Sequence, residues 1–96
     1  MLPDILAYEP ERNWLFVIEA VHSSNPIGPL RHKMLRELTK DCKAGCIYVS
    51  AFLDAKTFRK FAGEISWQTE VWIAESPDHV IHFDGERFLG PYQNLK

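Results

Sequence analysis

One carboxylate, Glu19, stands inside an apolar run of seven residues, Leu15 to Val21, with the sequence LFVIEAV. A run this apolar predicts a strand in the interior of a sheet. A carboxylate at such a place is costly unless a cation or hydrogen-bond donors accompany it. The chain must therefore fold so that a partner reaches Glu19 on this strand.

A hairpin is predicted to provide the first neighbour of Glu19. Residues 9–13 are polar, include a proline and predict a turn between this strand and a preceding one. Folding about the middle of the turn places Tyr8 opposite Leu15. The same register places Asp4 opposite Glu19, with their Cβ atoms about 4.5–5.5 Å apart and on one face of the sheet.

Two opposed carboxylates suggest a metal site. They repel each other unless one holds a proton or a cation lies between them. Hard divalent cations such as Mg²⁺ choose oxygen ligands of this kind. Asp4 and Glu19 are therefore candidate metal ligands. The alternative is that Asp4 caps a turn and that Glu19 pairs with a basic residue.

The bulk composition bounds the class of protein. Ninety-six residues, 46% of them hydrophobic, predict one domain over residues 1–96. The N-terminus carries no charged-then-apolar signal pattern, and no apolar run approaches the ~18 residues of a membrane span. We therefore expect a cytoplasmic protein with no membrane partner.

The charge is distributed unevenly along the chain. The net charge is −2, but residues 31–60 hold eight Lys or Arg against three Asp or Glu, so the remainder is strongly acidic. A basic segment beside an acidic site suits a phosphodiester substrate, because cations hold the backbone while the acids hold a metal. The alternative is that these charges are the solvated faces of two helices.

A helix is predicted after the second strand. Residues 22–28 are rich in turn formers, and Pro29 fits the first position of a helix. Arg31 lies on the predicted buried stripe, whereas Lys33 lies on the wetter side. Arg31 could reach the acidic site or a phosphate, or it could be the ion-pair partner of Glu19. The apolar residues of the stripe recur at helical spacing: Met34, Leu35, Leu38 and Cys42.

The rest of the chain completes an α/β pattern. Residues 46–52 predict a third strand, Asp54 an N-cap of a second helix, and residues 70–74 and 80–83 two further strands. The order strand-strand-helix-strand-helix-strand-strand predicts a mixed sheet flanked by helices, with a parallel crossover around the first helix. No Gly-rich phosphate loop or Ser-His-Asp pattern is present.

The spacing of the two acids resembles a known nuclease pattern. Pro3-Asp4, fourteen residues and then Glu19-Ala20-Val21 resemble the PD-(D/E)XK motif. The surrounding sequence is more specific, and over nearly the whole chain it resembles the C-terminal catalytic domain of the BsuBI/PstI type II restriction endonucleases. The matching stretches are NWLFVIEAV, the loop from Ser23 to Arg31, KDCKAG at 40–45, IYVSAF at 47–52 and residues 69–92.

The resemblance implies a fold and a reaction. It implies a restriction-endonuclease-like sheet and a Mg²⁺-dependent homodimer that cuts duplex DNA at CTGCAG, with a cognate DNA methyltransferase as its system partner. Asp4, Glu19 and the main-chain carbonyl of Ala20 would bind the metal, which activates a water for attack on the phosphate. Ser23, Arg31 and Lys33 are the expected DNA contacts.

Two departures from the family pattern qualify these expectations. The general motif has Lys two residues after Glu, where this chain has Val21. Arg31 is the first candidate to supply the missing cation, followed by Lys33 and His22. Family members also carry a large N-terminal DNA-reading portion, which this chain is expected to lack. The alternative function is a non-catalytic DNA-binding or interaction module that keeps the nuclease fold.

Overall fold

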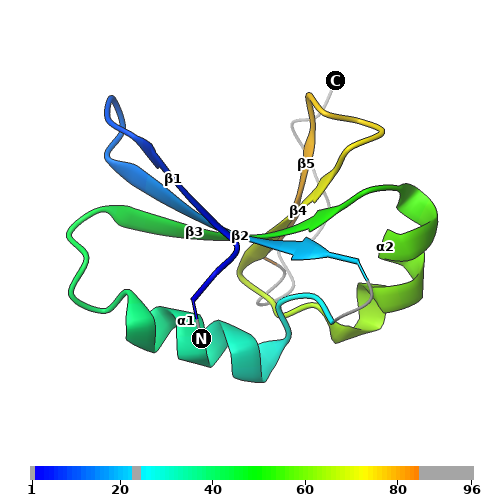
Figure 1. Cartoon of the computed structure of the whole chain (residues 1–96), viewed down its shortest axis with the longest axis horizontal. Helices are drawn as coiled ribbons and strands as arrows, with labels where there is room; N and C mark the ends of the chain where they lie inside the picture. Colours follow the sequence, from blue (N-terminus) through cyan, green and yellow to red (C-terminus); the bar gives the residue numbers. More distant parts are fainter. Residues whose placement is uncertain (1, 23–24, 85–96) are drawn as a thin grey trace, which may run out of the picture.

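The computed structural model describes residues 2–22 and 25–84. These residues form five strands, two α-helices and one 3₁₀ turn, and the predicted order of elements is confirmed (Figure 1). The elements are β1 (Ile5–Glu9), β2 (Trp14–Val21), α1 (Pro29–Leu38), β3 (Gly45–Phe52), α2 (Ala55–Phe61), η1 (Ala62–Glu64), β4 (Thr69–Ile73) and β5 (Val80–Phe83).

The strands form one mixed sheet in the order β1-β2-β3-β4-β5. The three inner strands are parallel to one another, while β1 and β5 run antiparallel to their neighbours. The predicted N-terminal hairpin and the parallel crossover around α1 are therefore both present. Strand β2, which carries Glu19, is paired on both edges, as its apolar sequence predicts.

Both helices pack on the same face of the sheet (Figure 1). Val17 on β2 is in register with Tyr48 on β3, and Val21 is in register with Phe52, so alternate residues of both strands point toward the helices. One apolar cluster consists of Val17, Ile27, Leu35 and Tyr48, and the other of Val21, Phe52, Ile65 and Val71. Glu19 lies between Val17 and Val21 and so faces the helix-covered side.

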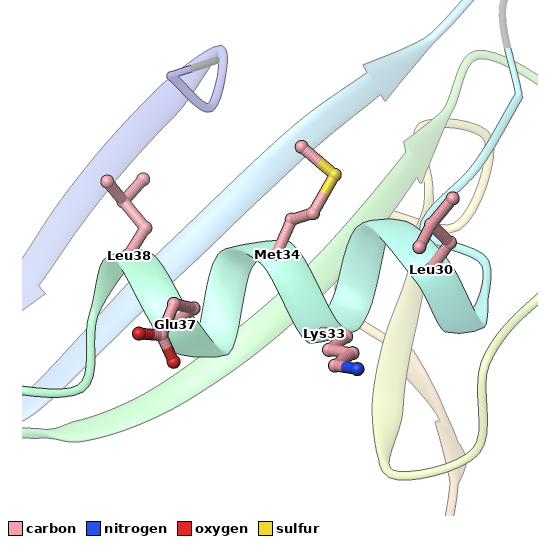
Figure 2. A pocket seen from close by; sticks show the side chains of 5 residues that line it. All are labelled: Leu30, Lys33, Met34, Glu37 and Leu38. Atoms are coloured by element: carbon pink, nitrogen blue, oxygen red, sulfur yellow. The ribbon is translucent and has the colours of Figure 1, made fainter.

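The predicted buried stripe of α1 is wrong for most of its members. Leu35 is fully buried, but Met34 is 44% exposed and Leu38 is 50% exposed. The helix ends at Leu38, and Cys42 lies beyond it and is exposed. Figure 2 shows Leu30, Met34 and Leu38 in one row along α1, with Lys33 and Glu37 on the adjoining side.

Polar residues with tertiary partners replace the expected apolar stripe. His32 is buried, its Nδ1 lies 3.0 Å from the hydroxyl of Ser66, and its ring packs edge-on against Tyr48. Burial, with a smaller contribution from the charge of Arg36, lowers the pKa of His32 below its ordinary value of 6.5. Thr39 donates to the carbonyl of Leu35 and pairs with the Tyr48 hydroxyl. These bonds turn α1 so that Met34 and Leu38 face outward.

The second helix is formed as predicted. Asp54 is its N-cap, and the carboxylate accepts a hydrogen bond of 2.8 Å from the backbone N–H of Thr57. This bond is the main cause of a lowered pKa for Asp54. No helix within residues 2–22 and 25–84 is long and apolar enough to cross a membrane.

Candidate metal centre and active site

The hairpin register brings Asp4 and Glu19 together as predicted. Tyr8 pairs with Leu15, and Ile5, the first residue of β1, pairs with Ile18. Asp4 immediately precedes Ile5 and continues this register. Its backbone N–H donates to Glu19 Oε2 at 3.3 Å, and its Oδ2 accepts a hydrogen bond of 2.8 Å from the backbone N–H of Ala20. The two carboxylates therefore lie at the open end of the hairpin.

Arg31 is the cation that reaches Glu19. Its Nε lies 2.6 Å from Glu19 Oε1, and the side chains are 21% and 16% exposed, respectively. The guanidinium also donates to the backbone carbonyl of Leu2 at 3.3 Å. Of the two alternatives for Arg31, the ion pair with Glu19 is therefore observed, and it brings the guanidinium to the acidic pair itself.

The start of α1 is fixed beside Glu19 by a buried hydrogen bond. Ser50 on β3 is in register with Glu19 and is fully buried. Its hydroxyl accepts a hydrogen bond of 2.9 Å from the backbone N–H of Ile27. A Cβ on the following residue, Gly28, would lie only 3.0 Å from the backbone oxygen of Glu64, so glycine permits this close approach. Arg31, one helical turn on, is thereby directed to Glu19.

Asp4, Glu19 and Arg31 line a common hollow of about 420 Å³, which we call the acidic hollow. The residues that line it include Leu2, Asp4, Glu19, Ala20, Asn25, Pro26, Arg31 and Met34. Among the described residues, no group of three or more His, Cys, Asp or Glu side chains could hold a metal ion. The donor set is thus two carboxylates and main-chain oxygens. Such a set fits Mg²⁺, which is commonly bound by one or two carboxylates and keeps several waters.

The other candidate residues lie apart from this hollow or outside the described chain. Lys33 is exposed and lines a neighbouring hollow of about 530 Å³ on α1, together with Glu37 (Figure 2). His22 is exposed at the end of β2. Ser23 lies outside the described residues. Sequence reasoning treated Asn25 only as part of a turn, whereas the structure places it on the wall of the acidic hollow.

Val21, which stands where the general motif has lysine, belongs to the apolar core. Val21 is 2% exposed and packs with Phe52, Ile65 and Val71 beneath α2. An ammonium group at this place would be surrounded by the apolar side chains of this cluster, and its desolvation is costly. The cation nearest the acids therefore comes from α1 rather than from β2.

The fold is that of a restriction endonuclease domain. The structure resembles the solved structure of the SdaI restriction endonuclease with a TM-score of 0.84 and 43% sequence identity, and the match covers 97% of this chain and 29% of that one. The model of the BsuBI/PstI restriction endonuclease domain matches residues 1–86. The chain belongs to this family, as its motifs predict.

Two proteins of similar sequence are type II restriction enzymes. The type II restriction enzyme BsuBI of Bacillus subtilis is 46% identical over 92 residues, which are 96% of this chain and 29% of the relative. The type II restriction enzyme AplI of Arthrospira platensis is 36% identical over 87 residues, which are 91% of this chain and 27% of the relative. The chain thus spans less than a third of the length of these relatives.

Proposed function

We propose that this chain forms the catalytic domain of a type II restriction endonuclease and hydrolyses phosphodiester bonds of duplex DNA with Mg²⁺. The observation that carries the proposal is the opposition of Asp4 and Glu19 at the open end of the hairpin, beside the Arg31 guanidinium. Bound Mg²⁺ would polarise a water and stabilise charge on the phosphate, leaving a 5′-phosphate and a 3′-hydroxyl.

The proposed metal ligands are Asp4, Glu19 and the carbonyl of Ala20. Asp4 Oδ2 is held by the Ala20 N–H, so the carboxylate is already oriented before a cation arrives. The N–H and C=O of one strand residue point to the same edge, so the Ala20 carbonyl faces the side on which Asp4 lies. These three groups offer oxygen atoms only, which suits a hard cation.

Arg31 is proposed to take the place of the motif lysine. Its positive charge offsets the repulsion between Asp4 and Glu19, and its bond to Glu19 Oε1 fixes the carboxylate. The guanidinium lines the same hollow and can stabilise charge on a phosphate held there. With Arg31 as the cation, position 21 does not have to contribute to the site, and Val21 remains in the apolar cluster.

The proposed substrate is duplex DNA carrying the family site CTGCAG. The proposed contacts to the DNA are Arg31 at the hollow, Lys33 on α1, and Ser23, which lies between β2 and α1 in the sequence. Exposed basic side chains on both helices support an electrostatic contact surface for phosphates: Lys33, Arg36, Lys56, Arg59 and Lys60. A cognate DNA methyltransferase would protect the host sequence, and both proteins would act in the cytoplasm.

A homodimer is proposed because a palindrome presents two identical half-sites. The exposed row of Leu30, Met34 and Leu38 on α1 supports one surface for it (Figure 2). If two α1 helices pack antiparallel across a two-fold axis near Met34, Lys33 faces Glu37 of the partner subunit. The charges beside the row are therefore self-complementary.

This surface can be tested by charge reversal. Lys33→Glu or Glu37→Lys alone places like charges opposite each other and should raise the dimer dissociation constant by about tenfold. An equal mixture of the two variants pairs opposite charges and should associate like the wild type in analytical ultracentrifugation. Lys60→Glu on α2 is the matched control. A mixture that associates no better than either variant alone would rule out this surface.

The test of the catalytic proposal is Mg²⁺-dependent cleavage of a plasmid that carries CTGCAG, with the same plasmid lacking the site as a control. Wild-type chain should cleave, and Glu19→Ala should not. Absence of metal-dependent cleavage by the wild type would favour the alternative of a non-catalytic DNA-binding module, which the loss of the motif lysine at Val21 makes reasonable. Equal cleavage by both proteins would indicate a contaminating nuclease.

A further inference from the structure

We propose that Asn25 is a further catalytic residue of this site, and that its side-chain amide donates a hydrogen bond to a non-bridging oxygen of the scissile phosphate. The inference rests on the proposed function and names a substrate contact within the same hollow. It concerns a residue that neither the PD-(D/E)XK pattern nor the charge distribution singles out.

Asn25 lies where two hollows meet. It lines the hollow of about 420 Å³ that contains Asp4, Glu19 and Arg31. It also lines an adjoining hollow of about 480 Å³ at the N-terminal end of α1, next to Pro29. Asn25 is exposed, and its side chain makes no hydrogen bond to another described residue. Its amide is therefore available to a ligand in the hollow that contains Asp4 and Glu19.

The backbone of Asn25 is held in place from its C-terminal side. The next residue, Pro26, is buried and disfavours the helical conformation at Asn25. Ile27 is fully buried, and its N–H donates to the Ser50 hydroxyl, which lies in register with Glu19. These contacts anchor the two residues that directly follow Asn25 and so restrict where its backbone can lie relative to the acidic pair. Such prior positioning lowers the cost of binding a substrate group.

An uncharged hydrogen-bond donor suits the binding of a phosphoryl oxygen in this hollow. The carboxylates of Asp4 and Glu19 only accept hydrogen bonds and repel an incoming phosphate. The guanidinium of Arg31 already donates to Glu19 and to the Leu2 carbonyl. The Asn25 amide carries two N–H donors and no charge, so it can hold a phosphoryl oxygen without competing for the metal's carboxylate ligands.

The test compares Asn25→Ala and Asn25→Asp with the wild type. Single-turnover cleavage with Mg²⁺ should fall by about a hundredfold to a thousandfold in Asn25→Ala, the scale of losing one hydrogen-bond donor to developing charge. Asn25→Asp should lose at least as much, because it adds a third carboxylate facing the phosphate. Duplex affinity in Ca²⁺ should weaken in the same order. Mn²⁺ affinity of the DNA-free Asn25→Ala protein, measured by calorimetry, should equal that of the wild type.

The contrary results are distinct. Cleavage and duplex affinity of Asn25→Ala equal to those of the wild type would overturn the inference. Retained cleavage with tighter Mn²⁺ binding in Asn25→Asp would also overturn it, because Asn25 would then act through its oxygen as a metal ligand. A wild-type chain that does not cleave would contradict the proposed function, while the duplex affinities would still decide the role of Asn25. Equal thermal unfolding midpoints exclude a folding defect as the cause.

Discussion

The β1–β2 hairpin carries a glutamate–arginine pair at each end, and the two pairs differ in their surroundings. At the turn, Glu9 bonds Arg12 three residues away, and their side chains are 27% and 60% exposed. At the open end, Glu19 bonds Arg31 from another element, and these side chains are 16% and 21% exposed. The same pair of residue types thus serves a local turn at one end and a shielded site at the other.

Each pair has a different set of additional contacts. The Glu9 carboxylate also accepts the backbone N–H groups of Glu11 and Arg12, and Arg12 lies 4.2 Å over the ring of Trp14. These contacts close the turn. The Glu19 carboxylate instead accepts a hydrogen bond from the backbone N–H of Asp4 and lines the hollow that contains both acids. The pair at the turn is formed by residues close in the sequence. The pair at the site forms only because the loop after β2 and α1 place Arg31 next to Glu19.

The largest expected effect separates the two arginines. Arg31→Ala should reduce Mg²⁺-dependent DNA cleavage by about a hundredfold or more, because it removes the cation beside both carboxylates and the phosphate, while metal binding stays measurable. Arg12→Ala is the matched control and should cleave like the wild type. Initial rates on a supercoiled plasmid provide the measurement. Full activity in Arg31→Ala would show that the reaction does not use this cation.

A second effect concerns stability and is best measured as a coupling energy. Double-mutant cycles to Ala at Glu19 and Arg31 should give about 1–3 kcal/mol, because a shielded charged hydrogen bond is stronger than an exposed one. The cycle at Glu9 and Arg12 should give a clearly smaller coupling, because this pair is exposed to solvent. The contact of Arg12 with Trp14 is lost in both Arg12 variants of the cycle and so does not enter the coupling energy. Urea unfolding supplies the free energies. Equal coupling at both ends would mean that burial does not distinguish the pairs.

The smallest effect is the pH dependence of the exposed pair. Chiefly the side-chain hydrogen bond from Arg12 lowers the pKa of Glu9 below its ordinary value of 4.5. Its contribution to stability is therefore present above that value and is lost as the pH falls through the lowered pKa, since the unfolded chain takes up the proton first. Glu9→Gln should show a shallower fall in unfolding free energy than the wild type as the pH is lowered from neutral to below 4.5. An unchanged slope would contradict this assignment.

Local features of the site were predictable, whereas contacts over long sequence distances were not. The turn and the alternation of two adjacent strands define the Asp4–Glu19 register, so the sequence alone predicts the acidic pair. The outward rotation of α1 depends on His32 meeting Ser66, 34 residues away. A pattern of apolar residues cannot detect a buried histidine that finds a distant partner. Asn25 was missed because its loop is anchored over a long sequence distance, through the hydrogen bond between Ile27 and Ser50.

Metal titration of the chain tests the central proposal that the metal ion binds at the open end of the hairpin and not at its turn. Calorimetry with Mn²⁺ in place of Mg²⁺ should detect binding to the wild type and to Glu9→Gln with the same affinity. Glu19→Gln keeps the size of the side chain but removes one of the two opposed carboxylates, so its binding should be lost or weakened by at least about a hundredfold. Equal Mn²⁺ affinity in Glu19→Gln and the wild type would contradict the assignment of Glu19 as a metal ligand.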